Sequence, residues 1–277
     1  MRVPRQMRLV AVMGGIMALT ASATGAVAST FDASVSPPRF EKRSRPGKIV
    51  RDIVRITNMG KTTGQYVVKT ADWQLAENGR LTYQEGAPAQ GSCRPWVRIE
   101  RHRTRVPAGR TKSYRFEVHV PADAKPQECR FALLISADPQ TLKPLSMGDI
   151  SFPVVGRVAV IVYLAVGDAK PRLEFRRLAM REVRGDVIPV ALIENLGNAH
   201  GRPFGSLTAT DANGRRVQLV VEQAPILPGQ KRVIELRPLG RVDAPAGDQP
   251  PKLRAPVQIR GRIEWDGGSV RLDQVVR

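Results

Sequence analysis

The sequence has few of the residues from which most enzyme and metal centres are built. Its 277 residues include only three histidines and two cysteines. Two cysteines are too few for a disulfide-rich mini-scaffold, so the fold must rest mainly on packing. The motifs of serine hydrolases, zinc peptidases, phosphate loops and dinucleotide-binding domains are missing, and paired carboxylates of the glycosidase kind cannot be assigned from a sequence. We expect no enzyme and no catalytic, cofactor-binding or metal-binding residues. The histidines, expected at the surface, are His102, His119 and His200.

Long hydrophobic runs are also scarce. The apolar run at residues 9–20 is shorter than the ~20 residues that span a bilayer. It follows a basic segment, 1–8, and precedes Ala26-Val27-Ala28, which carries small residues at the positions that signal peptidase reads. We therefore expect residues 1–28 to be a cleaved signal peptide rather than a membrane anchor. The mature chain would be exported, without stable insertion into a membrane.

Export bears on the two cysteines. An exported compartment oxidises thiols, which favours a disulfide between Cys93 and Cys129. The alternative is two thiols that are buried separately.

Sustained helical periodicity is absent, and period two takes its place. Tyr114, Phe116 and Val118 alternate with polar residues, as in a half-buried antiparallel strand. Asn213-Gly214, between two alternating runs, predicts a hairpin. We predict an all-β chain of two immunoglobulin-like β-sandwich domains, 29–167 and 168–277. Strands of the first domain are expected near 33–41, 49–58, 65–73, 95–101, 112–120, 128–136 and 149–166, and six or seven shorter strands are expected in the second.

One expected strand, 149–166, is more apolar than its neighbours. From Val158 onward both faces are apolar, which indicates burial on both sides. Pro153 cannot donate to a ladder and favours an edge, or a strand that is just entering the sheet. An apolar edge strand can pair with a partner by strand addition; alternatively the 137–149 loop covers it, or it packs in the core. The apolar row at its start is Ile150, Phe152 and Val154.

A set of short motifs in the first domain resembles a known family, the periplasmic pilus chaperones (PapD-like), in a divergent branch. The resemblance covers nearly all of that domain, while the second domain fits in architecture and length. No single motif is diagnostic, and the order of the set carries the resemblance. The motifs are Val35-Ser-Pro-Pro-Arg-Phe-Glu41, Pro46-Gly47, Ile56-Thr-Asn58, Asp72-Trp73, Pro95-Trp-Val97, Val106-Pro-Ala-Gly109 and the strand that begins at Tyr114.

The resemblance implies a periplasmic chaperone that lends an edge strand to fimbrial (pilin) subunits and delivers them to an outer-membrane usher. It implies that Arg39 binds the subunit's terminal carboxylate and that Ile150, Phe152 and Val154 fill the subunit's groove. The lysine that accompanies the arginine in this family is replaced by Ala159. Arg157, two residues earlier and on the same face, is the basic candidate to replace it. No cofactor is implied.

The charge leaves other functions to consider. A formal net charge of +19 could serve nucleic-acid binding. However, the arginines are spread along the strands, and exported proteins rarely meet nucleic acid, so we expect no nucleic-acid partner. The remaining alternative is an exported structural or adhesive subunit of a surface fibre. Such a subunit would polymerise, whereas a chaperone would form transient one-to-one complexes.

Overall fold

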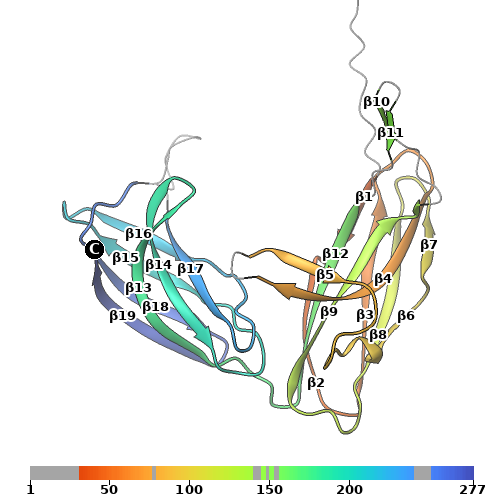
Figure 1. Ribbon diagram of the computed structural model, residues 1–277, viewed down its shortest axis with the longest axis horizontal. Helices are drawn as coiled ribbons and strands as arrows, with labels where there is room; N and C mark the ends of the chain where they lie inside the picture. The colour runs from red at the N-terminus through yellow and green to blue at the C-terminus, as the bar shows by residue number, and fades with distance from the viewer. Residues whose placement is uncertain (1–30, 77–78, 140–144, 148–149, 153–155, 240–250) are drawn as a thin grey trace, which may run out of the picture.

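The chain forms two β-sandwich domains in a computed structural model (Figure 1). The structure describes residues 31–76, 79–139, 145–147, 150–152, 156–239 and 251–277, so the expected signal peptide lies outside the described residues. The all-β prediction is confirmed, because the only helical element among the described residues' named elements is a short 3-10 turn, η1 (Arg94–Trp96). No helix in these ranges is long and apolar enough to cross a membrane.

Domain one packs two sheets face to face. One sheet has the strand order β1-β3-β8-β6, and the other has the order β2-β12-β9-β4-β5, with β7 also paired to β4. The first sheet consists of β1 (Ala33–Ser36), β3 (Ile49–Asn58), β8 (Thr111–His119) and β6 (Val97–Ile99). The second consists of β2 (Arg39–Ser44), β12 (Arg157–Val166), β9 (Gln127–Ala137), β4 (Gly64–Leu75), β5 (Leu81–Gln84) and β7 (Arg103–Val106).

The core of domain one follows from the period-two pattern. Tyr114, Phe116 and Val118 point inward from β8 and are almost completely buried, as predicted. The ring of Phe116 meets those of Phe40 and Phe131 edge to face, at centroid distances of 5.3 and 6.2 Å. Such aromatic pairs add to the stabilisation that burial of apolar area provides.

Domain two is a sandwich whose seven strands run in the order β13-β14-β17-β16-β15-β18-β19. The predicted hairpin at Asn213-Gly214 is confirmed, because it joins β15 to β16 and Gly214 has a φ of +76°, a value that glycine adopts readily. The strands are β13 (Leu173–Val183), β14 (Asp186–Asn195), β15 (Phe204–Thr210), β16 (Arg216–Val221), β17 (Lys231–Pro238), β18 (Val257–Trp265) and β19 (Gly268–Val276).

A buried asparagine ties three segments of domain one together. The Asn58 side chain donates from Nδ2 to the carbonyl oxygens of Thr62 and Val106, at 2.7 and 3.0 Å. Its Oδ1 accepts from the backbone N–H of Gly60 at 2.9 Å. The side chain thereby satisfies three backbone groups where β3 ends. We call this arrangement an asparagine latch.

Domain two contains the same latch. Asn195 Nδ2 donates to the carbonyl oxygens of Ala199 and Ile226, both at 2.8 Å, and Oδ1 accepts from Gly197 N–H at 2.9 Å. The two local spacings match those of Asn58, since the glycine lies two residues and the nearer carbonyl four residues after the asparagine in both domains. An inward isoleucine also precedes each asparagine by two residues. The two domains therefore share a local device that overall sequence identity does not reveal.

Removing the latch should be costly. Asn195→Ala would leave two carbonyls and two N–H groups without their partner at a fully buried position, so we expect a loss of about 3 kcal/mol in the free energy of unfolding. Urea denaturation followed by domain-two fluorescence measures it. Asn213→Ala, at an exposed turn, serves as the control and should cost less than about 1 kcal/mol. Equal effects of the two changes would contradict a stabilising role for the latch.

Candidate functional site

The candidate site lies where β2 joins β12. The two strands run parallel, with Arg39 beside Ile161 at the start and Ser44 beside Val166 at the end. On its other side β12 pairs with β9 along its whole length, from Arg157 onward. Among the described residues, the segment 157–160 therefore has a strand on one side only. Its second edge is open, directly in line with the beginning of β2.

Beside this open edge lies an apolar face of small side chains. Ala159 and Ile161 of β12 share the face with Ala132 and Leu134 of β9, which pair with them directly. At the far end of the face, Leu227 of domain two packs against this cluster. The later part of β12 is buried on both sides, as its sequence predicted. We call this surface the apolar platform.

Arg39 stands at the edge of the apolar platform. Its register beside Ile161 places both side chains on the same face of the sheet. The side chain is 49% exposed, and its Nε lies 2.8 Å from Oε1 of Glu41. It lines a cavity of about 480 Å³ between β2 and domain two. Arg39 is thus a partly exposed cation at the point where the open edge of β12 ends.

The joint between the domains lies next to Arg39. Glu41 is also 3.0 Å from the Nε of Arg202 and 3.7 Å from the Nε2 of His200 in domain two. The imidazole of His200 stacks on the ring of Tyr163 at a centroid distance of 3.9 Å. Burial raises the pKa of Tyr163 to about 12, so this ring remains neutral. Charges and a ring stack together fix domain two beside the platform.

His200 also corrects an expectation. The sequence suggested a surface loop residue, but its side chain is only 10% exposed, because domain two docks on domain one at this point. Glu128 of β9 accepts hydrogen bonds from both its backbone N–H and Nδ1. His119, in contrast, is partly exposed beside Glu117, as expected. No group of histidine, cysteine and acidic side chains in the described ranges could hold a metal ion.

Arg157 does not lie beside Arg39. It is four residues before Ile161, or about 13 Å along the strand. Its guanidinium forms an ion pair with Glu85, which also pairs with Lys69 Nζ at 3.2 Å. The structure therefore places the two predicted basic residues at separate points of the open edge.

Sequence reasoning did not identify Lys69 as a basic residue near the open edge. Leu134 pairs with Lys69 of β4 on one side and with Ala159 of β12 on the other, so the lysine lies in the same row as the alanine. The two residues are 90 positions apart in the chain, and only the pairing register brings them to one row. No local motif could have shown this.

The ion pairs of Glu85 predict a pH dependence. Burial raises the pKa of Glu85, but hydrogen bonds and charges from Lys69 and Arg157 outweigh it and hold the pKa below 4.5. A lowered folded-state pKa gives stabilisation that is present above the unfolded value and is lost as the pH falls through the folded value. We expect the amide resonances of β5 to shift as the pH falls below about 4.5, and Glu85→Gln to remove this transition. An unchanged titration in the variant would contradict the assignment.

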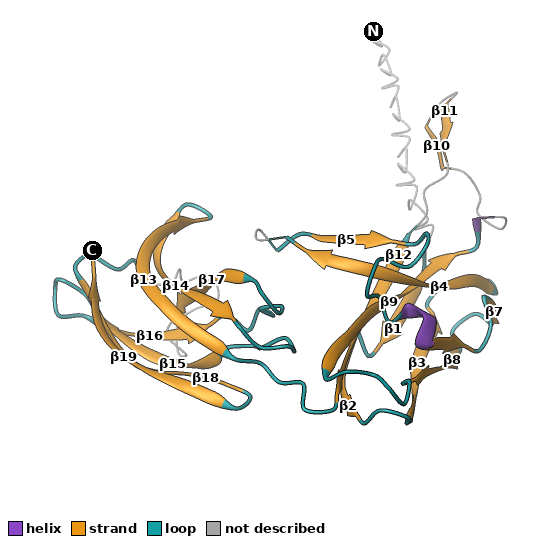
Figure 2. Cartoon of the chain, turned by 60° about the horizontal axis from the view of Figure 1, so that its bottom comes forward, coloured by secondary structure: helices purple, strands orange, loops and turns teal. Residues whose placement is uncertain are grey.

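Ile150 and Phe152 lie in a separate hairpin. They belong to β11 (Ile150–Phe152), which pairs with β10 (Leu145–Met147) in a two-stranded sheet. Figure 2 shows this hairpin apart from the two sheets of domain one. The single strand expected over 149–166 is therefore two strands in the described residues, β11 and β12. Val154, the third residue of the expected apolar row, lies outside the described residues.

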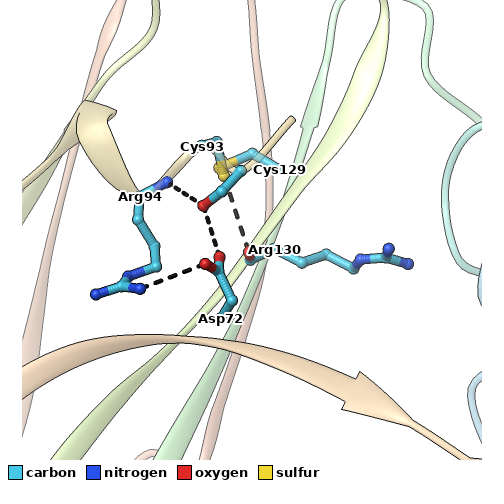
Figure 3. The surroundings of a disulfide bond; sticks show 6 residues. Asp72, Cys93, Arg94, Cys129 and Arg130 are labelled. Carbon is cyan, nitrogen blue, oxygen red and sulfur yellow. Dashed lines mark hydrogen bonds and ion pairs between the residues drawn. A yellow bond between two sulfur atoms is a disulfide. The ribbon is translucent and has the colours of Figure 1, made fainter. Parts of the chain in front are cut away.

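The predicted disulfide is confirmed. Cys93 is bonded to Cys129 of β9, with a Cα–Cα distance of 5.6 Å (Figure 3). Beside it, Asp72 accepts hydrogen bonds from Ser92 Oγ at 2.6 Å and from the guanidinium of Arg94 at 3.3 Å. These contacts hold the loop that carries Cys93 against β4.

The disulfide lies beside a fork between two strands. β4 and β9 pair as far as Ala71 and Ala132, after which β4 pairs with β5 instead. This β4–β5 arm, residues 72–76 and 79–84, extends toward domain two in both Figures 1 and 2. At its end, the carbonyl of Leu75 accepts a hydrogen bond from Gln230 at 3.0 Å. The β4–β5 arm therefore forms part of the surface of domain one that contacts domain two.

Comparisons with known proteins give likeness at the level of structure. No protein-family model and no curated protein matches the chain by sequence. The Pseudomonas aeruginosa CupB2 chaperone is 12% identical, with a TM-score of 0.44 over 88% of this chain and 100% of its own. The E. coli chaperone DraB is 13% identical, with a TM-score of 0.45 over 88% and 98%. The CsuC–CsuE chaperone–tip adhesion subunit complex from Csu pili of Acinetobacter baumannii gives 12% identity, a TM-score of 0.42 and coverage of 88% and 97%. Each of these similar structures is that of a chaperone, and the CsuC–CsuE complex comes from Csu pili.

Proposed function

We propose that this protein is a periplasmic chaperone that captures exported fimbrial subunits by strand addition and delivers them to an outer-membrane usher. The observation that carries the proposal is the open edge of β12 over 157–160, which ends at Arg39. An open strand edge has unpaired N–H and C=O groups that a partner strand can satisfy.

The direction of β2 supports a specific mode of capture. β2 runs parallel to β12 and begins at Arg39. A partner strand that lies along 157–160 in the same direction would run toward this residue, and its C-terminus would meet the guanidinium. A charge-assisted bond between the partner's carboxylate and Arg39 would then fix the register of pairing, because a slip by one residue turns every side chain to the other face.

The apolar row supplies the second half of the interaction. A subunit that lacks a strand exposes both a groove and unpaired backbone groups, and each is costly in water. In this proposal Ile150, Phe152 and Val154 fill that groove. Arg157 contacts the captured segment farther from its end, since it lies about 13 Å along the strand from Arg39's neighbour.

Co-expression tests the proposal. An exported subunit encoded beside this gene should be soluble and protease-resistant in the periplasm only when this protein is present, and the two should purify as a one-to-one complex. As a second test, the subunit is expressed with the Phe152→Ala variant, in which capture should weaken by roughly 2 kcal/mol from lost apolar burial. Equal solubility of the subunit without the protein would reject a chaperone. Polymers of this protein alone would favour the structural subunit instead.

A further inference from the structure

The cavity of about 480 Å³ beside Arg39 has walls from both domains. β2 contributes Arg39, Glu41 and Arg43. Domain two contributes Arg202 and Phe204. The domain-two wall is held in place, because Arg202 is 3.0 Å from Glu41 and also donates to the carbonyl of Gln223 at 3.0 Å. The cavity is therefore a built feature of the domain joint.

Phe204 is unusual among the residues that line this cavity. It is the first residue of β15, and 41% of it is exposed. Of the large apolar residues that are exposed in the described ranges, it is the one that lines the cavity. It belongs to neither domain's core. An aromatic side chain in a concave, charged setting is typical of a binding contact, whereas scattered apolar residues on convex surfaces need no explanation.

The charges of the cavity define the chemistry of its occupant. The guanidinium of Arg43 forms an ion pair with Asp266 and donates a hydrogen bond to the carbonyl of Ala169. Arg202 is occupied by Glu41 and Gln223. Arg39 pairs with Glu41 through Nε, and its half-exposed guanidinium retains terminal N–H groups for a further acceptor. An occupant that presents one carboxylate and one apolar side chain would match Arg39 and Phe204 together.

We propose that Phe204 binds the apolar side chain of the partner's last residue while Arg39 binds the carboxylate of that same residue. This inference rests on the proposed function and adds to it a preference for the terminal residue. Domain two thereby takes part in selecting the partner. Subunits that end in an apolar residue would bind more tightly than those that end in a small polar residue.

Two synthetic peptides test this inference with the full mature chain. Both are acetylated segments of alternating threonine and valine with a free C-terminal carboxylate; one ends in leucine and the other in serine. Titration calorimetry should show about tenfold tighter binding of the leucine peptide, as expected for burial of one apolar side chain. Phe204→Ala should abolish this difference and leave the serine peptide unaffected. Val220→Ala, an equally exposed apolar residue on the neighbouring strand β16, is the matched control and should leave both affinities unchanged.

The outcomes separate this inference from the proposed function. If Arg39→Ala weakens the binding of both peptides and Phe204→Ala removes only the preference for leucine, both the inference and the proposed function stand. If Arg39→Ala weakens both peptides but Phe204→Ala leaves the preference intact, or lowers both affinities alike, the role of Phe204 is wrong and the capture mode remains. If Arg39→Ala changes neither affinity, the capture mode itself is rejected.

Discussion

Arg39→Ala is expected to weaken the proposed capture of a subunit about 100-fold and to leave this protein folded. A carboxylate held by two charge-assisted hydrogen bonds of one guanidinium loses about 3 kcal/mol when both are removed, which corresponds to that factor. The fold should tolerate the change, because the Arg39–Glu41 pair is about half exposed and such surface pairs contribute at most about 1 kcal/mol. Pull-down of the co-expressed subunit measures capture, and circular dichroism measures the fold.

Two further variants make this result specific. Arg39→Lys keeps the charge but not the planar fork, so it should restore only part of the capture. Arg51→Ala removes a comparably exposed, ion-paired arginine from β3 in the other sheet, and should leave capture unchanged. If the Arg39→Ala protein retains the subunit as well as the wild type does, Arg39 is not the carboxylate site.

Replacing Cys93 and Cys129 by serine is expected to lower the free energy of unfolding of domain one by about 4 kcal/mol. The bridge closes a chain segment with a sequence separation of 36 residues, and the chain-entropy relation gives this magnitude for such a loop. The effect should extend to the domain joint, since Asp72 ties the loop that carries Cys93 to the β4–β5 arm, and this arm carries Leu75. Guanidinium denaturation without reductant measures the loss.

Domain two provides the internal control for this experiment. All cysteines of the chain lie in domain one, so the unfolding of the second domain should be insensitive to the substitution apart from the contacts at the joint. Reduction of the wild type with a thiol should reproduce the phenotype of the variant. A variant that unfolds at the same denaturant concentration as the oxidised wild type would show that the bridge does not stabilise the domain.

Features that local sequence encodes were predicted correctly. Tyr114, Phe116 and Val118 of β8 alternate with polar residues and are almost completely buried. The turn at Asn213-Gly214 joins β15 to β16, as expected. Each depends on neighbours within a few residues, because side-chain alternation and turn geometry are properties of one short segment.

Features that depend on register and docking could not be predicted in this way. His200 becomes buried because domain two places it on Tyr163, a residue 37 positions earlier that strands β13 and β14 separate from it in the chain. Lys69 and Arg157 meet at Glu85 because strands β4, β9 and β12 and the base of the β4–β5 arm converge there. The chain also breaks its most apolar segment into β11 and β12, where alternation alone suggested one strand.

The paired asparagine latches bear on the order in which an exported chain can fold. Each latch closes within its own domain, over 48 residues from Asn58 to Val106 and over 31 residues from Asn195 to Ile226. A chain that emerges from a membrane pore with its N-terminus first can therefore close the first latch while the residues of the second are still in transit. Neither closure has to wait for the other, and the long-range step that remains is the docking of two preformed halves.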